Sequence, residues 1–552
     1  MRDTKVFLLG LDGATWDLIM PWISEGELPT FKMLIKGGAW GILESCIPPI
    51  TLPAWACMLT GKNPGKIGAV HFLMRSSESY EFKVVKLYLE KVNPLWSMLN
   101  TSGKRSALFY VPTIAPDFQS FNGMYIPSDV IPCGEYPYPQ QLSTLINKFG
   151  LDESPPKLGR VDPAEYIRWW CENTRRHFEF INYFLDRVGQ WDFLMHVIYS
   201  NDHLSHLFWK YIDKKHPDYE RDDEIYEAFL NYYKVIDNML RNVIQKCNSR
   251  NIIFFLVSDH GHGPLVKRID LNRWLLENGY LRIREDLKNS SGKREASKFS
   301  EIFKKKVLES PVIRSRFVCR LLKRMPYVRR LLRQIFVNLD VRTDVVDWQN
   351  TKAYFAGYNG ININLKGREP EGIVEVSEYE KVRSDLINML KQLRDPETGI
   401  TVVKNVYRRE EIYWGDCLSR LPDIVIEYIN ESFYESCLSF GETFLKRDMF
   451  YKPSDPPVSS AHTRRGIFLA YGPDIRCMGD KPLKVSIYDI TPTILHIFSL
   501  PIPNDIDGKV LTEIFDLESS IAKRKPAFVN PDYYQLKISI LKLRKKVKKY
   551  KQ

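Results

Sequence analysis

The sequence predicts an α/β fold built on a central, mostly parallel sheet, and two apolar runs carry this prediction. Val6–Leu11 and Ile252–Val257 are almost continuously apolar, as strands buried on both faces of a parallel sheet are. Asp12 follows the first run and Asp259 follows the second, each beside a glycine-containing turn. Because ligands of open α/β sheets bind at the carboxyl ends of strands, we expect a functional site where these two runs end.

The segment after the second run, Ser258–Gly263, combines one acidic residue with two histidines. It reads Ser-Asp-His-Gly-His-Gly. Imidazoles and a carboxylate have little use in packing at this position and are common metal ligands. We therefore interpret Asp259 and His260 as candidate metal ligands, together with Asp12. An ordinary turn after a strand is the alternative interpretation for Asp12-Gly13.

Asp202 and His206 form a second pair, four residues apart. If this stretch is helical, both side chains face the same side, at a spacing that one cation can bridge. A solvated helix face is the alternative interpretation. His462 precedes the apolar run Ile467–Ala470, so we expect it in a loop that enters another strand. Mixed Asp and His ligands suit zinc, and manganese or iron also accept them.

Thr51 is the candidate nucleophile. It stands between Pro48-Pro49 and Pro53, a pattern that disfavours a helix before the threonine and permits one soon after it. The hydroxyl is then expected near a helix N-terminus, where backbone N–H groups and the helix dipole favour a phosphoryl group. Since a threonine hydroxyl is a weak nucleophile at neutral pH, it needs a base or a metal, and a metal is the expected activator.

The order of these residues resembles the alkaline phosphatase superfamily, specifically its type I phosphodiesterase and nucleotide pyrophosphatase branch of the prokaryotic cytoplasmic type, over most of the chain. The segments that carry the resemblance are Gly10–Asp17, Thr51–Gly68, Asp202 with His206, Ser258–Gly261, Ala461-His462, Asn362–Gly372, Asp489–Leu495 and Asp507-Gly508. The resemblance implies an alkaline-phosphatase-like three-layer sandwich with a central, mostly parallel sheet and inserted cap segments.

The resemblance also implies two divalent metal ions, with zinc expected first and manganese or iron as alternatives. One ion would be held by Asp202, His206 and His462, and the other by Asp12, Asp259, His260 and the Thr51 oxygen. Thr51 would attack phosphorus to form a covalent phosphothreonine, which water then hydrolyses. The implied activity is hydrolysis of phosphodiester or pyrophosphate bonds in a small phosphoester, such as a nucleotide or a nucleotide-sugar.

The same superfamily includes other activities, which are alternatives to phosphodiester hydrolysis. A sulfatase is disfavoured because Thr51 cannot yield the formylglycine aldehyde and Trp55 stands where the sulfatase arginine would be. A phosphomonoesterase, or a transferase that passes the phosphoryl-linked group to a lipid or sugar acceptor, uses the same metal pair and stays an alternative. A catalytically silent binding protein is disfavoured because no ligand position is lost.

Two departures from the family pattern limit the comparison. Many relatives carry His where this chain has Ile67, so no role of that imidazole is carried over. The residue that contacts the phosphoryl oxygen is unassigned, because the expected Asn is absent about twenty residues past Thr51. Lys62, Asn63 and Lys66 are candidates for it, and a solvated loop is the alternative interpretation of these three residues.

The chain of 552 residues is too long for one ordinary domain, so we expect one large core with insertions. We divide it into three core segments, two insertions and a tail. The core segments are 1–71, with the first metal ligand and the nucleophile, 192–280, with further metal ligands, and 346–518, with the last metal ligand. The others are an inserted lid or substrate segment (72–191), a basic helical insertion (281–345) and a basic amphipathic tail (519–552). Aromatic side chains of the lid segment can stack on a nucleobase or sugar, although core packing is their commoner use.

Positive charge is concentrated in two of these segments. Residues 281–339 carry 17 Lys and Arg against 5 Asp and Glu, and residues 519–552 carry 11 against 1. The tail repeats apolar residues among lysines, as a basic amphipathic helix does, and such a helix can lie on an anionic membrane. A solubilising, partly disordered tail is the equal alternative. Nucleic acid is the least expected partner, since neither segment forms a recognisable binding module.

Cysteine usage and the lack of targeting signals predict a cytoplasmic protein, with peripheral contact to a membrane surface as the other option. The nine cysteines include no Cys-x-x-Cys pair, which favours a reducing compartment. The first predicted strand begins so early that no cleavable leader is expected before it. No apolar run approaches the roughly 20 residues that a bilayer span requires.

Overall fold

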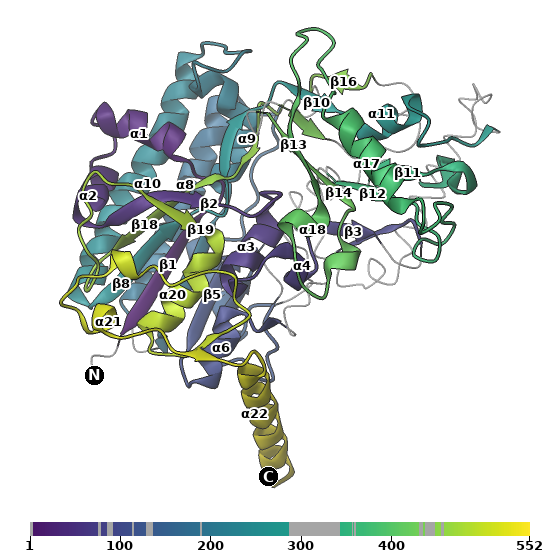
Figure 1. The fold of residues 1–552 in the computed structure, drawn as a ribbon. Coiled ribbons are helices and arrows are strands. Elements are labelled where there is room, and N and C mark those ends of the chain that lie inside the picture. The colour runs from purple at the N-terminus through teal and green to yellow at the C-terminus, as the bar shows by residue number, and fades with distance from the viewer. Residues whose placement is uncertain are drawn as a thin grey trace.

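The structure is a computed structural model of the chain. It describes residues 4–75, 79–84, 92–112, 115–128, 136–187, 190–285, 343–355, 357, 360–429, 434–436, 448–453 and 458–551. A larger lobe with a central sheet and a smaller lobe lie beside each other, and one helix projects from the base of the larger lobe (Figure 1).

An eight-stranded sheet forms the centre of the larger lobe and confirms the predicted α/β fold. Its strands, in spatial order, are β19 (Leu483–Ser486), β2 (Ala39–Glu44), β18 (Arg465–Tyr471), β8 (Ile252–Val257), β1 (Lys5–Leu11), β7 (Phe193–Ile198), β5 (Ser106–Val111) and β6 (Gly123–Pro127). β1 runs parallel to both of its neighbours, β7 and β8. β18 runs antiparallel to β2 and β8, so the sheet is mostly parallel.

Helices cover both faces of this sheet and complete three layers. Side chains of β1 alternate between the two faces, as in any strand: Phe7 and Leu9 lie in one hydrophobic core, and Val6 and Leu8 lie in the other. The first core includes α1 (Trp16–Ser24), α2 (Pro29–Gly37), α8 (Pro163–Leu185) and α10 (Asp223–Ser249). The second includes α3 (Thr51–Thr60), α6 (Leu95–Thr101) and α20 (Ile490–Ile497).

The smaller lobe has its own sheets and its own hydrophobic core. An antiparallel sheet contains β11 (Ala353–Phe355), β12 (Gly360–Ile363), β14 (Ile424–Tyr428) and β13 (Val403–Arg408), and its core includes residues of α17 (Tyr379–Leu390). A three-stranded sheet contains β15 (Tyr434–Ser436), β10 (Lys267–Ile269) and β16 (Phe450–Tyr451).

The segments drawn from the sequence are distributed over these lobes. Segment 72–191, interpreted as an inserted lid, supplies β5, β6 and α8 to the main sheet and its helical layer, because apolar strand runs alternate with its Pro-rich loops. Segment 346–518 spans the sheet of the smaller lobe and also β18. Most of the predicted basic insertion, 281–345, lies outside the described residues.

The basic tail forms α22 (Asp532–Lys551), which packs against α6 at its beginning and then projects away from the body (Figure 1). In the described ranges, none of the helices combines the length and the apolar character needed to cross a membrane.

Candidate functional site

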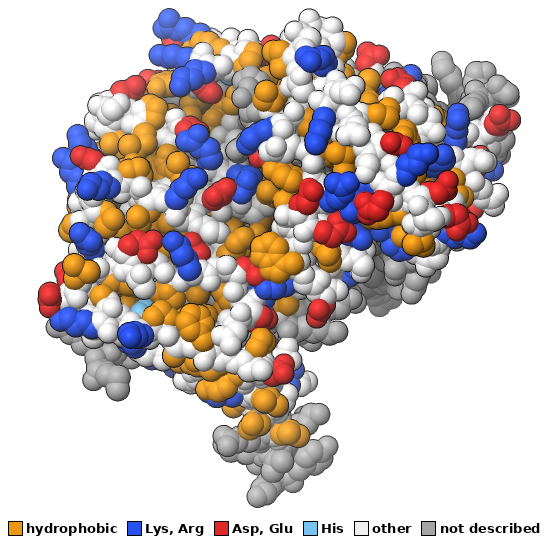
Figure 2. Space-filling view, in the orientation of Figure 1, with side chains coloured by type: hydrophobic (Ala, Val, Ile, Leu, Met, Phe, Trp, Pro, Cys, Tyr) orange, Lys and Arg blue, Asp and Glu red, His pale blue; other side chains and the backbone are white. Residues whose placement is uncertain are grey.

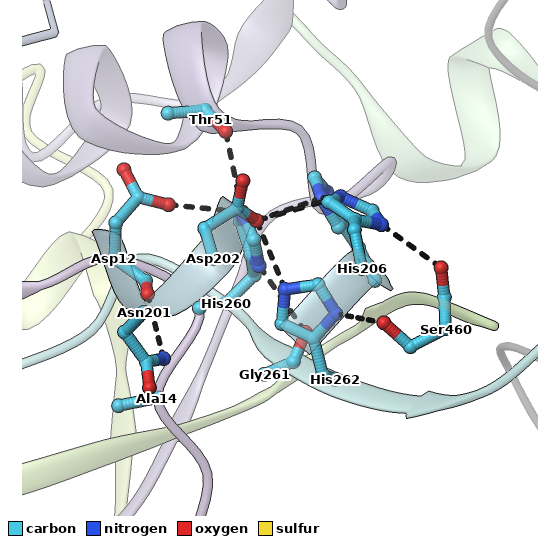
Figure 3. Close-up of polar contacts among 12 residues, drawn as sticks. Asp12, Ala14, Thr51, Asn201, Asp202, His206, His260, Gly261, His262 and Ser460 are labelled. Atoms are coloured by element: carbon cyan, nitrogen blue, oxygen red, sulfur yellow. Dashed lines mark hydrogen bonds and ion pairs between the residues drawn. The ribbon is translucent and has the colours of Figure 1, made fainter. Parts of the chain in front are cut away.

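The fold brings all seven predicted site residues to the carboxyl end of the central strands. Figure 3 labels five of them, Asp12, Thr51, Asp202, His206 and His260. Asp12 follows β1 and Asp259 and His260 follow β8, so parallel pairing of these strands places their ends side by side. Asp202 and His206 lie in α9 (Ser200–Ile212), which begins just after β7. Thr51 is the first residue of α3, as the proline pattern predicts, and belongs to the same cluster.

His462 lies in a short strand and not in the predicted loop. β17 (Ser460–Thr463) pairs antiparallel with β9 (Gly261–Pro264), and His462 stands opposite His262 in this register. The loop prediction was wrong because the pairing partner is almost 200 residues away in sequence, and β9 is too short and too rich in glycine to read as a strand. This pairing brings His462 to the group formed by Asp202 and His206.

Asp12, Asp259, His260 and Thr51 form the first part of the site. His260 Nε2 lies 3.5 Å from Asp12 Oδ1 and 3.4 Å from Asp259 Oδ2, and Thr51 Oγ1 lies 3.3 Å from the same nitrogen. Asp12 Oδ1 and Asp259 Oδ2 are buried, and among the described residues neither has a hydrogen-bond donor. A buried carboxylate oxygen without a donor is costly, so these two oxygens fit a bound cation.

Asp202, His206 and His462 form the second part. His206 Nδ1 donates to the Ser460 carbonyl at 2.9 Å, and His462 Nδ1 donates to the Pro49 carbonyl at 2.8 Å. In the neutral rings, both Nε2 atoms therefore carry lone pairs, and these atoms face each other at 3.0 Å.

The Asp202 carboxylate completes this second donor set. Its Oδ1 lies 3.2 Å from His462 Nε2 and 3.6 Å from His206 Nε2. Two facing lone pairs beside a carboxylate repel one another unless a proton or a cation lies between them. Two imidazole nitrogens and one carboxylate oxygen are a ligand set that zinc accepts, with a position left open for water or substrate.

Burial dominates the electrostatics of the first part. It raises the pKa of Asp12 to about 8, and the nearby Asp202 carboxylate adds to the shift. It also raises the pKa of Asp259 well above its usual range, with Asp12 as the next cause. Burial lowers the pKa of His260 well below its ordinary value, which keeps that imidazole neutral. Neutral imidazole and closely spaced carboxylates together favour a divalent cation.

The Asp202 carboxylate shows the opposite balance. Burial acts to raise its pKa, but the electrostatic interaction with His206 and the hydrogen bonds from His262 and His462 outweigh burial, and the pKa lies well below its usual range. Burial likewise acts to lower the pKa of His462, but Asp202 outweighs it and raises that pKa. A proton on His462 therefore balances the negative charge of the Asp202 carboxylate, which a bound cation would balance in the same way.

His262 is a residue of the site that the sequence analysis quoted but did not assign. Its Nε2 lies 2.9 Å from Asp202 Oδ1 and its Nδ1 lies 2.9 Å from Ser460 Oγ. Because a carboxylate only accepts, Nε2–H donates to Asp202 and the Ser460 hydroxyl donates to Nδ1. Burial lowers the pKa of His262 to about 3, so the ring stays neutral and orients Asp202. The second histidine of the Asp-His-Gly-His-Gly motif is the signal that could have identified it.

Two further contacts hold the Asp12 end of the site. Trp55 donates its Nε1–H to Asp12 Oδ2 at 3.1 Å. Gly13 adopts a φ of +68°, and a Cβ at this position would lie 2.7 Å from the ring of His262. The turn after β1 therefore requires glycine, both for its backbone conformation and for the close approach of the imidazole. The role of Trp55 was not predicted, because no local pattern relates an indole in a helix to a distant strand end.

The three candidates for the oxyanion contact are engaged elsewhere in the structure. Lys62 Nζ lies 2.5 Å from Asp505, and Lys66 Nζ lies 2.5 Å from Asp507. Asn63 is buried and donates from Nδ2 to the same Asp507 at 2.9 Å. The solvated-loop interpretation is wrong for Lys62 and Asn63, since both are buried, and these contacts assign a structural role to all three side chains.

Comparisons with known proteins agree with this architecture. A family model described as type I phosphodiesterase / nucleotide pyrophosphatase matches residues 6–436. No curated protein matches the chain significantly. Phosphonoacetate hydrolase from Sinorhizobium meliloti 1021, in complex with phosphonoacetate, is similar in structure, with a TM-score of 0.51 and 13% identity over 89% of this chain and 94% of that chain. Murine ectonucleotide pyrophosphatase / phosphodiesterase 5 has a TM-score of 0.46 and 13% identity, over 93% of this chain and 100% of that chain. At such identity, the similarity to the hydrolase supports the fold.

Proposed function

Because the chain belongs to the type I phosphodiesterase / nucleotide pyrophosphatase family, we propose that it hydrolyses phosphodiester or pyrophosphate bonds with Thr51 as the nucleophile. The proposed substrate is a small phosphoester such as a nucleotide or a nucleotide-sugar. The observation that carries the proposal is the position of the Thr51 hydroxyl at the N-terminus of α3, 3.3 Å from His260 Nε2. That nitrogen lies beside two buried carboxylate oxygens, Asp12 Oδ1 and Asp259 Oδ2, which lack a donor among the described residues.

Two divalent metal ions are part of this proposal. Asp12, Thr51, Asp259 and His260 would hold one ion, and Asp202, His206 and His462 would hold the other. The ligand atoms of Asp12, Asp259 and His260 lie within 4.8 Å of one another, which supports the first set. Zinc suits this mixture of carboxylates and imidazoles, and manganese or iron also accept it. Bound divalent ions lower the cost of forming an alkoxide and of developing charge on the transferred phosphoryl group.

Thr51 performs the covalent step in this proposal. Attack forms a bond between Thr51 Oγ1 and phosphorus and breaks the bond from phosphorus to the leaving-group oxygen. Water then attacks the same phosphorus, which releases the phosphoryl product and returns the Thr51 hydroxyl. The first turn of α3 contributes backbone N–H groups and the positive end of the helix dipole, both of which favour the anionic substrate.

The test compares two chromogenic substrates, bis-p-nitrophenyl phosphate and p-nitrophenyl phosphate, with the metal-loaded protein. We expect faster cleavage of the diester, and a loss on the order of 10⁴-fold in Thr51→Ala, because the remaining site cannot replace the nucleophile. Thr51→Ser should keep measurable activity. Thr60→Ala is the matched control, since Thr60 is buried at the other end of α3 and its hydroxyl donates to the Ala56 carbonyl.

Each contrary result has a defined meaning. Preference for the monoester would identify a phosphomonoesterase. Product that carries an added acceptor alcohol would identify a transferase. Activity that survives in Thr51→Ala would remove Thr51 as nucleophile. Acid-quenched intact-mass analysis adds an independent readout, since a covalent adduct should appear in the wild type and be absent in Thr51→Ala.

A further inference from the structure

Helix α22 carries a stripe of apolar side chains that the body of the protein leaves uncovered. Leu536, Ile540 and Leu543 are 63%, 49% and 61% exposed. Their spacing of four and three residues places them on one face of the helix. Figure 2 shows hydrophobic side chains on the described part of this projecting helix.

The opposite face of α22 holds the helix to the body. Tyr534 is buried and its hydroxyl donates to the Pro501 carbonyl at 2.7 Å. Lys542 Nζ lies 2.8 Å from Asp117 Oδ2. Ile538 and Leu541, on the same side as Tyr534, are partly buried. Because one face is anchored, the apolar stripe has a defined direction away from the body.

The charge of the helix indicates which kind of partner can bind this apolar stripe. Asp532–Lys551 contains eight Lys and Arg and a single acidic residue. A second copy of the same helix would bring like charges together, which disfavours self-association. Nucleic acid would pair with the basic residues but would leave the three aliphatic side chains exposed to water. An anionic lipid surface satisfies both features, because it offers phosphate groups and an apolar layer beneath them.

We propose that α22 docks the protein on an anionic phospholipid surface, with Leu536, Ile540 and Leu543 inserted below the headgroups and the net positive charge of the helix attracted to the lipid phosphates. Docking leaves the candidate active site free. α22 packs on α6, which leads into the amino end of β5, whereas the site lies beyond the carboxyl ends of the strands. A six-residue strand separates these two edges by about 20 Å.

Vesicle sedimentation with the full chain tests this proposal. We expect binding to vesicles of phosphatidylglycerol and phosphatidylcholine, and at least about 10-fold weaker binding to phosphatidylcholine alone. The triple variant Leu536→Gln, Ile540→Gln, Leu543→Gln keeps every charge and should bind about 100-fold more weakly. Leu517→Gln is the matched control, because Leu517 is 68% exposed outside α22, and it should bind as the wild type does.

Three results would overturn the proposal. One is no binding of the wild type to anionic vesicles, and another is equal binding to both kinds of vesicle. The third is wild-type binding by the triple variant, which would identify a purely electrostatic surface for a polyanion. The proposal is independent of the proposed function, because vesicle binding needs no turnover. Hydrolysis of bis-p-nitrophenyl phosphate and the melting temperature should be unchanged in the triple variant, since its substitutions lie on an exposed face remote from the site.

Discussion

Replacement of Trp55 by Phe tests how the helical core positions the Asp12 carboxylate. Trp55 lies one turn after Thr51 in α3, and its indole N–H is 3.1 Å from Asp12 Oδ2. The indole also packs closely on β1, since a Cβ at Gly10 would lie 2.5 Å from its ring. Phe retains an aromatic ring at this place but removes the donor to the carboxylate. The other oxygen, Asp12 Oδ1, is the proposed metal ligand.

The expected loss of metal affinity in Trp55→Phe follows from the kind of hydrogen bond that is lost. A buried hydrogen bond to a charged acceptor contributes about 1.5–3 kcal/mol, and loss of such a contact behind a metal ligand lowers metal affinity by about 10–100-fold. The smaller ring also leaves a cavity, which lowers the free energy of unfolding by about 1 kcal/mol or more. The two effects are separable, because the cavity does not by itself change metal affinity.

Trp40→Phe provides the matched control. Trp40 is buried in β2 and donates its Nε1–H to the Gly479 carbonyl at 2.7 Å, so the same substitution removes a comparable donor and the same volume. Zinc-buffered titrations measure the metal affinity of both variants, and thermal melts measure their stability. We expect weaker metal binding in Trp55→Phe alone, and activity that recovers as free zinc is raised. Equal metal affinity in the two variants would refute the positioning role of Trp55.

Three further predictions concern the site and the smaller lobe. His262→Phe removes the donor to Asp202 and should weaken metal binding by about 10–100-fold in a zinc-buffered titration; unchanged affinity would show that His262 only fills space. Chelation should lower the melting temperature, because metal at about a thousand times its Kd contributes about 4 kcal/mol to the folded state; identical melts with EDTA and with zinc would exclude a bound ion. Asp423 is buried, and burial raises its pKa, but Arg368 outweighs burial and the net pKa is lowered. Its stabilising effect is therefore full above the unfolded pKa of about 4 and is lost as the pH falls through the lower folded pKa. Asp423→Asn should lower the free energy of unfolding by about 3–5 kcal/mol at pH 7, and the variant should lose less stability than the wild type as the pH falls. Chemical denaturation at several pH values measures this, and the same loss of stability at low pH in both proteins would contradict the prediction.

The part of the fold that sequence analysis predicted depends on local patterns. The runs that became β1 and β8 are apolar enough to read as buried strands, and each is followed within two residues by a carboxylate in a glycine-containing turn. Thr51 was placed at a helix start because the proline pattern around it has few other conformations. These predictions succeeded because each depends on a few neighbouring residues.

Other features depend on pairing between distant segments and were not predicted. The antiparallel direction of β18 and the separate sheet of the smaller lobe follow from strand partners far apart in sequence. The strand that carries His462 forms only against β9. The contact of Trp55 with Asp12 joins a helix to a strand end, and its geometry exists only after the helix packs on the sheet.

The sequence by itself determined the chemistry of this protein: which carboxylates, imidazoles and hydroxyl are available, in which order, and at the ends of which strands. The tertiary structure decided how close they come, which nitrogen of each candidate histidine ligand donates to a backbone carbonyl, and that His262 and Trp55 donate to the candidate ligands Asp202 and Asp12. The physical reason is that residue type sets what a group can donate or accept, whereas distance and burial set which of those possibilities is realised. Both are established only when strands and helices distant in the chain pack together.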